Sequence, residues 1–174
     1  MKLLDFPNLQ QLYEYDCGAC ALQAVLIYYG VKTRRGLIMK CAKTHTKTGT
    51  LALGMKRVLK KFGLKCDDKK IDLKKIKRYI DKKIPILLLL QAWHPQKVNY
   101  AISNASGHWV VAIGYDKNKI IFEDPYVSEK TYLTKQELKK RWHAKENGKI
   151  IMGYAIAVSG KKPTYNSKKI IAMK

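Results

Sequence analysis

The segment at positions 17–29, CGACALQAVLIYY, is almost wholly apolar. Apolar side chains on every side are typical of a helix buried at the centre of a fold. Gly30 directly follows this segment, and glycine suits the position just past a helix C-terminus because it adopts the left-handed conformation at little cost. We therefore expect one central helix, around which the rest of the chain packs.

The remaining elements follow from hydrophobic periodicity and from their boundary residues. Helices are predicted over about 33–43, 51–62 and 73–82, with a polar loop at 45–50. Strands are predicted over 84–93, 108–115, 120–123 and 149–159, with a long loop at 94–107 and a turn at 116–119. Thr134 and Glu137 form a capping-box pattern that begins a helix ending near 143. Most predicted helices precede the predicted strands, which form a mostly antiparallel sheet. This order along the chain predicts an α+β fold.

The chain has the length of one domain, 174 residues, which is enough to bury a core without disulfides or metals. It contains no internal repeat and no clear linker. We predict a single domain over 1–160, followed by a basic tail over 161–174 that is loosely held.

The charge is strongly positive, with 35 Lys and Arg against 13 Asp and Glu and a formal net charge of +22. Most of these residues are lysines spread over nearly every predicted helix, whereas readers of phosphates and bases also rely on arginine. We interpret the charge as a solvated coat that attracts polyanions nonspecifically. A specific nucleic-acid partner is not expected.

The N-terminus and the cysteines bear on the compartment. Residues 1–16 lack the apolar core of a secretory signal, and the longest apolar run, 84–90, is far shorter than the roughly 20 residues of a membrane-spanning helix. The four cysteines, Cys17, Cys20, Cys41 and Cys66, do not suggest a disulfide framework in a chain of this size. We expect a cytoplasmic protein without a membrane span.

Cys17 lies where a loop enters the predicted central helix. The backbone N–H groups and dipole at a helix N-terminus stabilise a thiolate, which makes this sulfur a candidate nucleophile. Gly18 leaves room for the backbone of a substrate to approach. The side-chain amide of Gln11, six residues earlier, can form an oxyanion hole together with the backbone N–H of Cys17.

Three other interpretations use the same residues. The CxxC at 17–20 is also the pattern of dithiol redox proteins, but the βαβ context is missing. A zinc site would need a second ligand pair, and the four histidines are scattered, so no metal or cofactor is predicted. Cys20 is a rival nucleophile, but the residue six before it is Glu14, whose carboxylate would repel a developing oxyanion. We therefore prefer Cys17.

A thiol nucleophile needs a base and a group that orients the base. His108 begins a predicted strand after Gly107, and Asp124 ends the next strand, so the Asp124 carboxylate can accept from the imidazole ring.

The hairpin geometry complicates this pairing. If Tyr115 pairs with Ile120 in a tight hairpin, Asp124 faces Val111 rather than His108, an offset of three residues or roughly 10 Å. A different register, a β-bulge or a bend is then required to bring the two side chains together.

The ordered set of these motifs resembles the papain-like bacteriocin-processing peptidases, the double-glycine-leader family. The matching positions are Gln11, Asp16-Cys17-Gly18, Tyr28-Tyr29-Gly30, Gly49-Thr50, Gly107-His108-Trp109-Val110-Val111 and Phe122-Glu123-Asp124-Pro125. The resemblance covers about 9–157. It implies a papain-like fold with the nucleophile on a central buried helix, packed on a mostly antiparallel sheet.

The resemblance also implies residue roles. It assigns Gln11 to the oxyanion hole, Cys17 as nucleophile, His108 as base and Asp124 as the group that orients it. In the family, cleavage follows a Gly-Gly pair that ends a leader peptide, and the peptidase is often the N-terminal domain of an ATP-driven exporter. This sequence contains no transporter segments and so is similar to the free-standing members. It departs from the family pattern at Ala19, where proline is common, and in its high charge.

We predict a cysteine peptidase that acts on a peptide or protein through a thioester acyl-enzyme and needs no cofactor. The substrate is expected to contact Gly18, Gly107 and Trp109. Two alternatives stay open at this point. One is a non-catalytic module on the same fold that binds a peptide or a polyanion, and the other is an acyl transferase or isopeptidase that uses the same thiolate.

Overall fold

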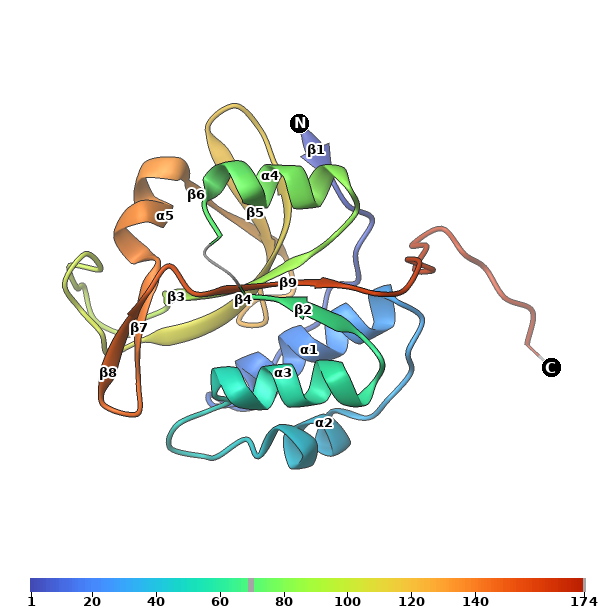
Figure 1. Cartoon of the computed structure of the whole chain (residues 1–174), viewed down its shortest axis with the longest axis horizontal. Helices are drawn as coiled ribbons and strands as arrows, with labels where there is room; N and C mark the ends of the chain where they lie inside the picture. Colours follow the sequence, from blue (N-terminus) through green and yellow to red (C-terminus); the bar gives the residue numbers. More distant parts are fainter. Residues whose placement is uncertain (69–70, 174) are drawn as a thin grey trace.

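The computed structural model describes residues 1–68 and 71–173. A mostly antiparallel sheet lies between two layers of helices (Figure 1). Helices α1 (Cys17–Tyr28), α2 (Arg35–Ala42) and α3 (Ala52–Lys61) lie on one side, and α4 (Leu73–Asp81) and α5 (Lys135–Arg141) lie on the other. The predicted α+β class is confirmed.

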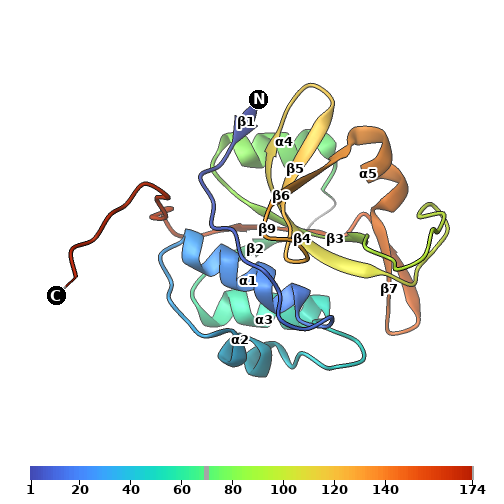
Figure 2. The ribbon, with the colours of Figure 1, turned by 180° about the vertical axis from the view of Figure 1, so that it is seen from behind.

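Helix α1 is the centre of the fold, as its all-round apolar sequence predicts. It packs against the sheet on one side and against α2 and α3 on the other, and most of its residues are buried (Figure 2). Gly30, just beyond its end, has a φ of 77°, which a side chain would disfavour. Because α1 is fixed on all sides, the position of its first residue, Cys17, is also fixed.

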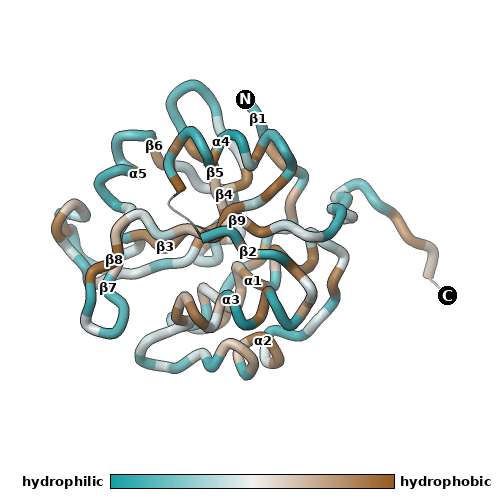
Figure 3. Tube along the Cα trace, viewed as in Figure 1, coloured by the Kyte–Doolittle hydropathy of each residue, from teal (hydrophilic) through white to brown (hydrophobic). Residues whose placement is uncertain are grey.

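The main sheet has the strand order β2-β9-β3-β4-β5-β6, and every neighbouring pair is antiparallel. These strands are β2 (Lys65–Asp67), β3 (Ile86–Gln91), β4 (Gly107–Tyr115), β5 (Lys119–Glu123), β6 (Lys130–Thr134) and β9 (Ala155–Ser159). A short β1 (Lys2–Leu3) pairs with the end of β4. Every residue of β3 is buried, because helices cover both faces of the sheet. In Figure 3 the turn between β4 and β5 is hydrophilic.

Several predicted boundaries differ from the structure. The strand expected over 149–159 is two strands, β8 (Lys149–Met152) and β9, because the chain turns at Gly153 with a φ of 63°. Strand β8 pairs instead with β7 (His143–Glu146) in a separate hairpin, which sequence analysis missed. Helix α2 begins at Arg35 rather than near 33, with Arg34 as its N-cap residue and no side-chain cap. The capping box of Thr134 and Glu137 at the start of α5 is confirmed.

The C-terminal tail is attached to the body through part of its length. The backbone N–H groups of Thr164 and Tyr165 donate to the carbonyl of Tyr28 at 3.0 and 3.2 Å. The N–H of Ser167 donates to Asp5 at 3.0 Å. Beyond these contacts the chain extends away from the body (Figure 1). Within residues 1–68 and 71–173, no helix combines the length and hydropathy needed to cross a lipid bilayer.

Candidate active site

The Cys17 thiol lies at the N-terminus of α1, where sequence analysis placed it. The side chain is buried. Burial alone raises the pKa of this thiol. The hydrogen bond from His108 and the positive charge of its ring outweigh burial, so the pKa of Cys17 lies below its ordinary value.

His108 bridges Cys17 and Asp124. Its Nε2 lies 2.7 Å from Oδ1 of Asp124, which leaves Nδ1 as the ring nitrogen available to the sulfur. Burial lowers the pKa of His108, but the bonds to Asp124 and Cys17 raise the pKa further, to about 9. A thiol with a lowered pKa beside an imidazole with a raised pKa favours the ion pair of thiolate and imidazolium.

Asp124 is held by more groups than the imidazole. Its Oδ1 also accepts from the backbone N–H of Tyr126 at 3.0 Å, and its Oδ2 accepts from Trp93 Nε1 and Thr131 Oγ1, both at 3.0 Å. Burial raises the pKa of Asp124, but the bond to His108 more than offsets burial and the pKa is lowered. Trp93 and Thr131 were not predicted from the sequence, because each lies on a different segment from Asp124 and neither belongs to a recognisable motif.

A β-bulge accounts for the meeting of His108 and Asp124. Tyr115 does pair with Ile120, but the register shifts between Ala112 and Gly114, so that Val111 pairs with Glu123. Continuing this register places Asp124 opposite Val110 rather than Val111. His108 and Val110 point to the same face of a strand, whereas His108 and Val111 point to opposite faces. His108 and Asp124 are then offset by two residues along the strands and lie on the same face of the sheet, a diagonal separation that their side chains can span.

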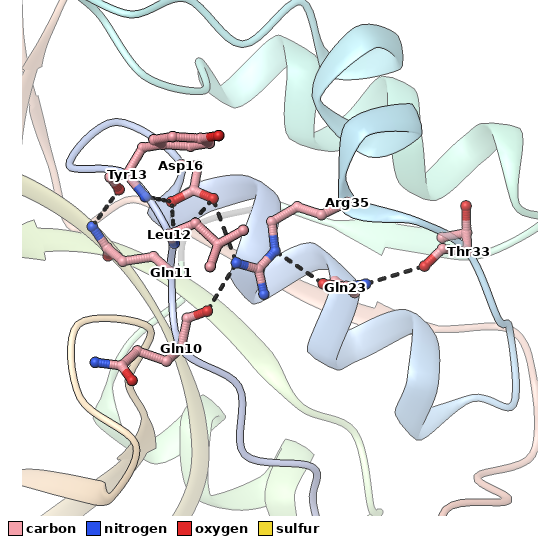
Figure 4. Close-up of polar contacts among 8 residues, drawn as sticks. All are labelled: Gln10, Gln11, Leu12, Tyr13, Asp16, Gln23, Thr33 and Arg35. Carbon is pink, nitrogen blue, oxygen red and sulfur yellow. Dashed lines mark hydrogen bonds and ion pairs between the residues drawn. The ribbon is translucent and has the colours of Figure 1, made fainter.

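Gln11 lies on the segment that leads into α1 and runs beside the end of β5. Its backbone N–H donates to the carbonyl of Pro125 at 2.7 Å, next to Asp124. Its side-chain Nε2 donates to the carbonyl of Tyr13 at 2.8 Å, so the amide turns along its own loop (Figure 4). An amide carries two N–H donors, so one remains for a ligand.

A cleft of about 500 Å³ lies against Cys17. Gly107 and Trp109 line this cleft, together with a loop before α3 and the β7–β8 hairpin. Gly18 lies behind the cleft wall. A Cβ at Gly18 would lie 2.7 Å from Thr50 Cβ and 3.0 Å from Trp109 Cδ1, so its lack of a side chain serves the packing of these two residues.

The β7–β8 hairpin crosses to the helical side of the cleft. Oε1 of Glu146 accepts from the backbone N–H of Ala52 at 2.6 Å, at the start of α3. Helix α3 has no cap from its own N-cap residue, Leu51, so Glu146 supplies the missing acceptor. Glu146 and Leu51, the residue before Ala52, both line the cleft, and the bond therefore joins its two walls.

The two cysteines of the CxxC differ sharply. Cys20 is wholly buried one turn into α1, and burial raises the pKa of its thiol far above the ordinary value. Only Cys17 is therefore activated, which argues against Cys20 as the nucleophile. All four cysteines are free thiols. Among residues 1–68 and 71–173, no three His, Cys, Asp or Glu side chains form a group suited to a metal ion.

The sequence also matches a known protein family. The family model described as the peptidase C39 family matches residues 5–147, a range that includes the candidate site residues from Gln11 to Glu146. The chain belongs to the peptidase C39 family of papain-like cysteine peptidases. The predicted family and fold are thereby confirmed.

Individual relatives show the same likeness. The chain is 26% identical over 133 residues to the pediocin PA-1 transport/processing ATP-binding protein of Pediococcus acidilactici, a match that covers 76% of this chain and 17% of that protein. The peptidase domain of Streptococcus ComA, a bi-functional ABC transporter involved in a quorum sensing pathway, is 25% identical, with a TM-score of 0.68 over 92% of this chain and 98% of that one.

A third structure is a double glycine motif protease from an AMS/PCAT transporter in complex with its leader peptide. It has a TM-score of 0.68 and 17% identity, and the match covers 94% of this chain and 95% of that one. At this identity the likeness concerns the fold. The chain spans about a sixth of the length of the curated relative that it matches.

Proposed function

We propose that this chain hydrolyses peptide bonds through a thioester formed on Cys17. The observation that carries the proposal is the 2.7 Å contact of His108 with Asp124, together with the coupling of His108 to Cys17, which lowers the pKa of the thiol and raises the pKa of the imidazole. This is the arrangement that gives a cysteine a nucleophilic thiolate and gives the leaving group a proton donor.

The chemistry follows from these positions. The thiolate of Cys17 attacks the carbonyl carbon, and the oxyanion is held by the backbone N–H of Cys17 and by the side chain of Gln11. The imidazolium of His108 gives its Nδ1 proton to the leaving amine, the C–N bond breaks, and a thioester remains. His108, now neutral, takes a proton from water, and the resulting hydroxide displaces the thiolate to release the acid. Asp124 holds the ring in place through both steps.

The proposed substrate is a leader peptide cut after small residues such as Gly-Gly. The comparisons support this choice, because one similar structure is a double glycine motif protease with its leader peptide. The site supports it as well, because the wall of the cleft next to Cys17 is closely packed by Thr50 and Trp109. A substrate backbone without side chains fits most easily against such a wall.

The test uses a synthetic leader peptide ending in Gly-Gly and followed by a reporter amine. Wild-type protein should release the reporter, and Cys17→Ala should release none while keeping its thermal unfolding temperature. Cys41→Ala is the matched control, because Cys41 is a half-buried free thiol away from the site, and this variant should keep full activity.

A second measurement addresses the nucleophile directly. Iodoacetamide should modify Cys17 faster than the other three cysteines near neutral pH, because its thiol pKa is lowered, whereas burial raises the thiol pKa of Cys20 and Cys66. Equal rates at all four thiols, or turnover that survives Cys17→Ala, would overturn the proposal.

A further inference from the structure

A buried ion pair lies behind the loop that carries Gln11. The side chain of Asp16 is fully buried, and its carboxylate accepts from the backbone N–H groups of Leu12 at 3.2 Å and Tyr13 at 3.1 Å (Figure 4). Nη1 of Arg35 lies 3.4 Å from the same carboxylate. Asp16 thus accepts from two consecutive N–H groups directly after Gln11, while Arg35 balances its charge.

Arg35 also holds the residue before Gln11. Its Nη1 donates to the carbonyl of Gln10 at 2.8 Å, and its Nε donates to Oε1 of Gln23 at 2.9 Å. The amide of Gln23, on α1, donates in turn to the carbonyl of Thr33 at 3.1 Å. The guanidinium therefore ties the loop before α1 to α1 itself and to the start of α2 (Figure 4).

These contacts enclose the proposed oxyanion donor. Gln10 is held by Arg35, and Leu12 and Tyr13 are held by Asp16, so both flanks of Gln11 are fixed to one ion pair. Asp16 also directly precedes Cys17, whose backbone N–H is the other proposed donor. That donor is on the first residue of α1 rather than in the loop, so the ion pair holds the Gln11 half of the oxyanion hole.

We infer that Arg35 is a positioning residue, which acts through Asp16 and Gln10 to hold the loop of Gln11 in the geometry that stabilises the oxyanion. This inference rests on the proposed function. A donor stabilises a transition state only if its position is set before the reaction, since reorganisation during the reaction costs free energy. The planar guanidinium of Arg35 sets that position because its separate N–H groups contact Asp16, Gln10 and Gln23 at once. A lysine has a single ammonium group and can contact only part of this set.

The test compares kcat and KM for the Gly-Gly reporter peptide among Arg35→Ala, Arg35→Lys, Gln11→Ala and the double variant Arg35→Ala/Gln11→Ala. Arg34→Ala is the matched control, because Arg34 is the exposed neighbouring arginine. We expect Gln11→Ala to lower kcat about a hundredfold, as for the loss of one oxyanion donor, and Arg35→Ala to lower it about tenfold. KM should change by less than about twofold in both, since the contact is made in the transition state.

Two readouts separate positioning from a merely structural role. The double variant should be no slower than Gln11→Ala, because a loop without its amide gains nothing from being held in place. The rate of alkylation of Cys17 by iodoacetamide should stay at the wild-type value in Arg35→Ala, because that reaction forms no oxyanion. Arg35→Lys should lie between the wild type and Arg35→Ala, and it provides the comparison if the alanine variant does not fold.

The possible outcomes separate a failure of this inference about Arg35 from a failure of the proposed peptidase function. If wild type and Arg34→Ala turn over the peptide but Arg35→Ala and Arg35→Lys match them, the inference fails and the proposed function stands. Losses that multiply in the double variant, or slower alkylation in Arg35→Ala, also overturn the inference alone. A wild-type protein with no turnover and no selective alkylation of Cys17 overturns both.

Discussion

The carboxylate of Asp124 reaches the ring of His108 across two strands whose register is shifted by one residue. The shift lies between Ala112 and Gly114, and the intervening Ile113 has no partner on β5. One extra residue moves every later side chain of a strand to the opposite face, so the bulge turns the two side chains from opposite faces to the same face. The 2.7 Å contact between them depends on that single irregularity.

The charge of Asp124 is expected to be essential to the pair of Cys17 and His108. Asp124→Asn keeps the shape of the side chain but removes the negative charge that raises the pKa of His108. The thiolate then loses its cationic neighbour, and we expect kcat to fall by at least about tenfold. Ultraviolet absorbance of the thiolate, followed against pH, should show a higher pKa for Cys17. Asp116→Asn, in the β4–β5 turn, should change neither quantity.

The sequence predicted those parts of the site that depend on local pattern. The all-round apolar segment after Cys17 predicted α1, and the position of the cysteine at its start predicted an activated thiol. The hairpin spacing required a different register, a β-bulge or a bend, but nothing in the alternation of β4 selects the bulge or places it at Ile113. The bonds from Trp93 and Thr131 to Asp124 depend on tertiary packing of separate segments, and so does the contact of Arg35 with Asp16.

The pH profile of kcat/KM should be bell-shaped. The acid limb follows the thiol of Cys17, whose pKa is lowered, and the alkaline limb follows His108, whose pKa of about 9 marks the loss of the proton given to the leaving amine. Rates measured between pH 5 and 10.5 at constant ionic strength, with a substrate that does not titrate, would test this. A rate that rises steadily through pH 8.5 and beyond, as for a free thiol, would contradict the ion pair.

His108 and Asp124 should make folding stability depend on pH. The pKa of His108 is raised above its unfolded value of 6.5, so its contribution is complete below that value and is lost as the pH rises through about 9. The pKa of Asp124 is lowered from 3.8, so its contribution is present above that value and is lost as the pH falls through the folded pKa. Urea unfolding of wild type and Asp124→Asn should show the wild type losing its advantage at both extremes.

The bond from Glu146 to Ala52 should contribute to both stability and substrate binding. Glu146→Ala removes the acceptor at the start of α3, and the loss of such a cap costs about 1 kcal/mol. The midpoint of urea unfolding should decrease with no change in its slope, and KM for the reporter peptide should change because the two cleft walls are no longer joined. Glu146→Gln keeps an accepting oxygen and should restore most of the stability. Glu129→Ala, at an exposed position, should leave both measurements at the wild-type value.

Glu123 has a buried carboxyl group whose ionised form is destabilised by its surroundings. Burial raises its pKa to about 8, and its Oε2 has no hydrogen-bond partner among the residues that the structure describes. A carboxyl with a raised pKa stabilises the fold only below its unfolded value of 4.5, and this contribution is lost as the pH rises through about 8. Glu123→Gln keeps the acceptor for the N–H of Leu9 and carries no charge. We therefore expect this variant to gain stability over the wild type between pH 5 and pH 9, by about 1 kcal/mol or more. Urea unfolding at both pH values measures the gain, and an equal difference at the two values would show that Glu123 does not titrate in this range.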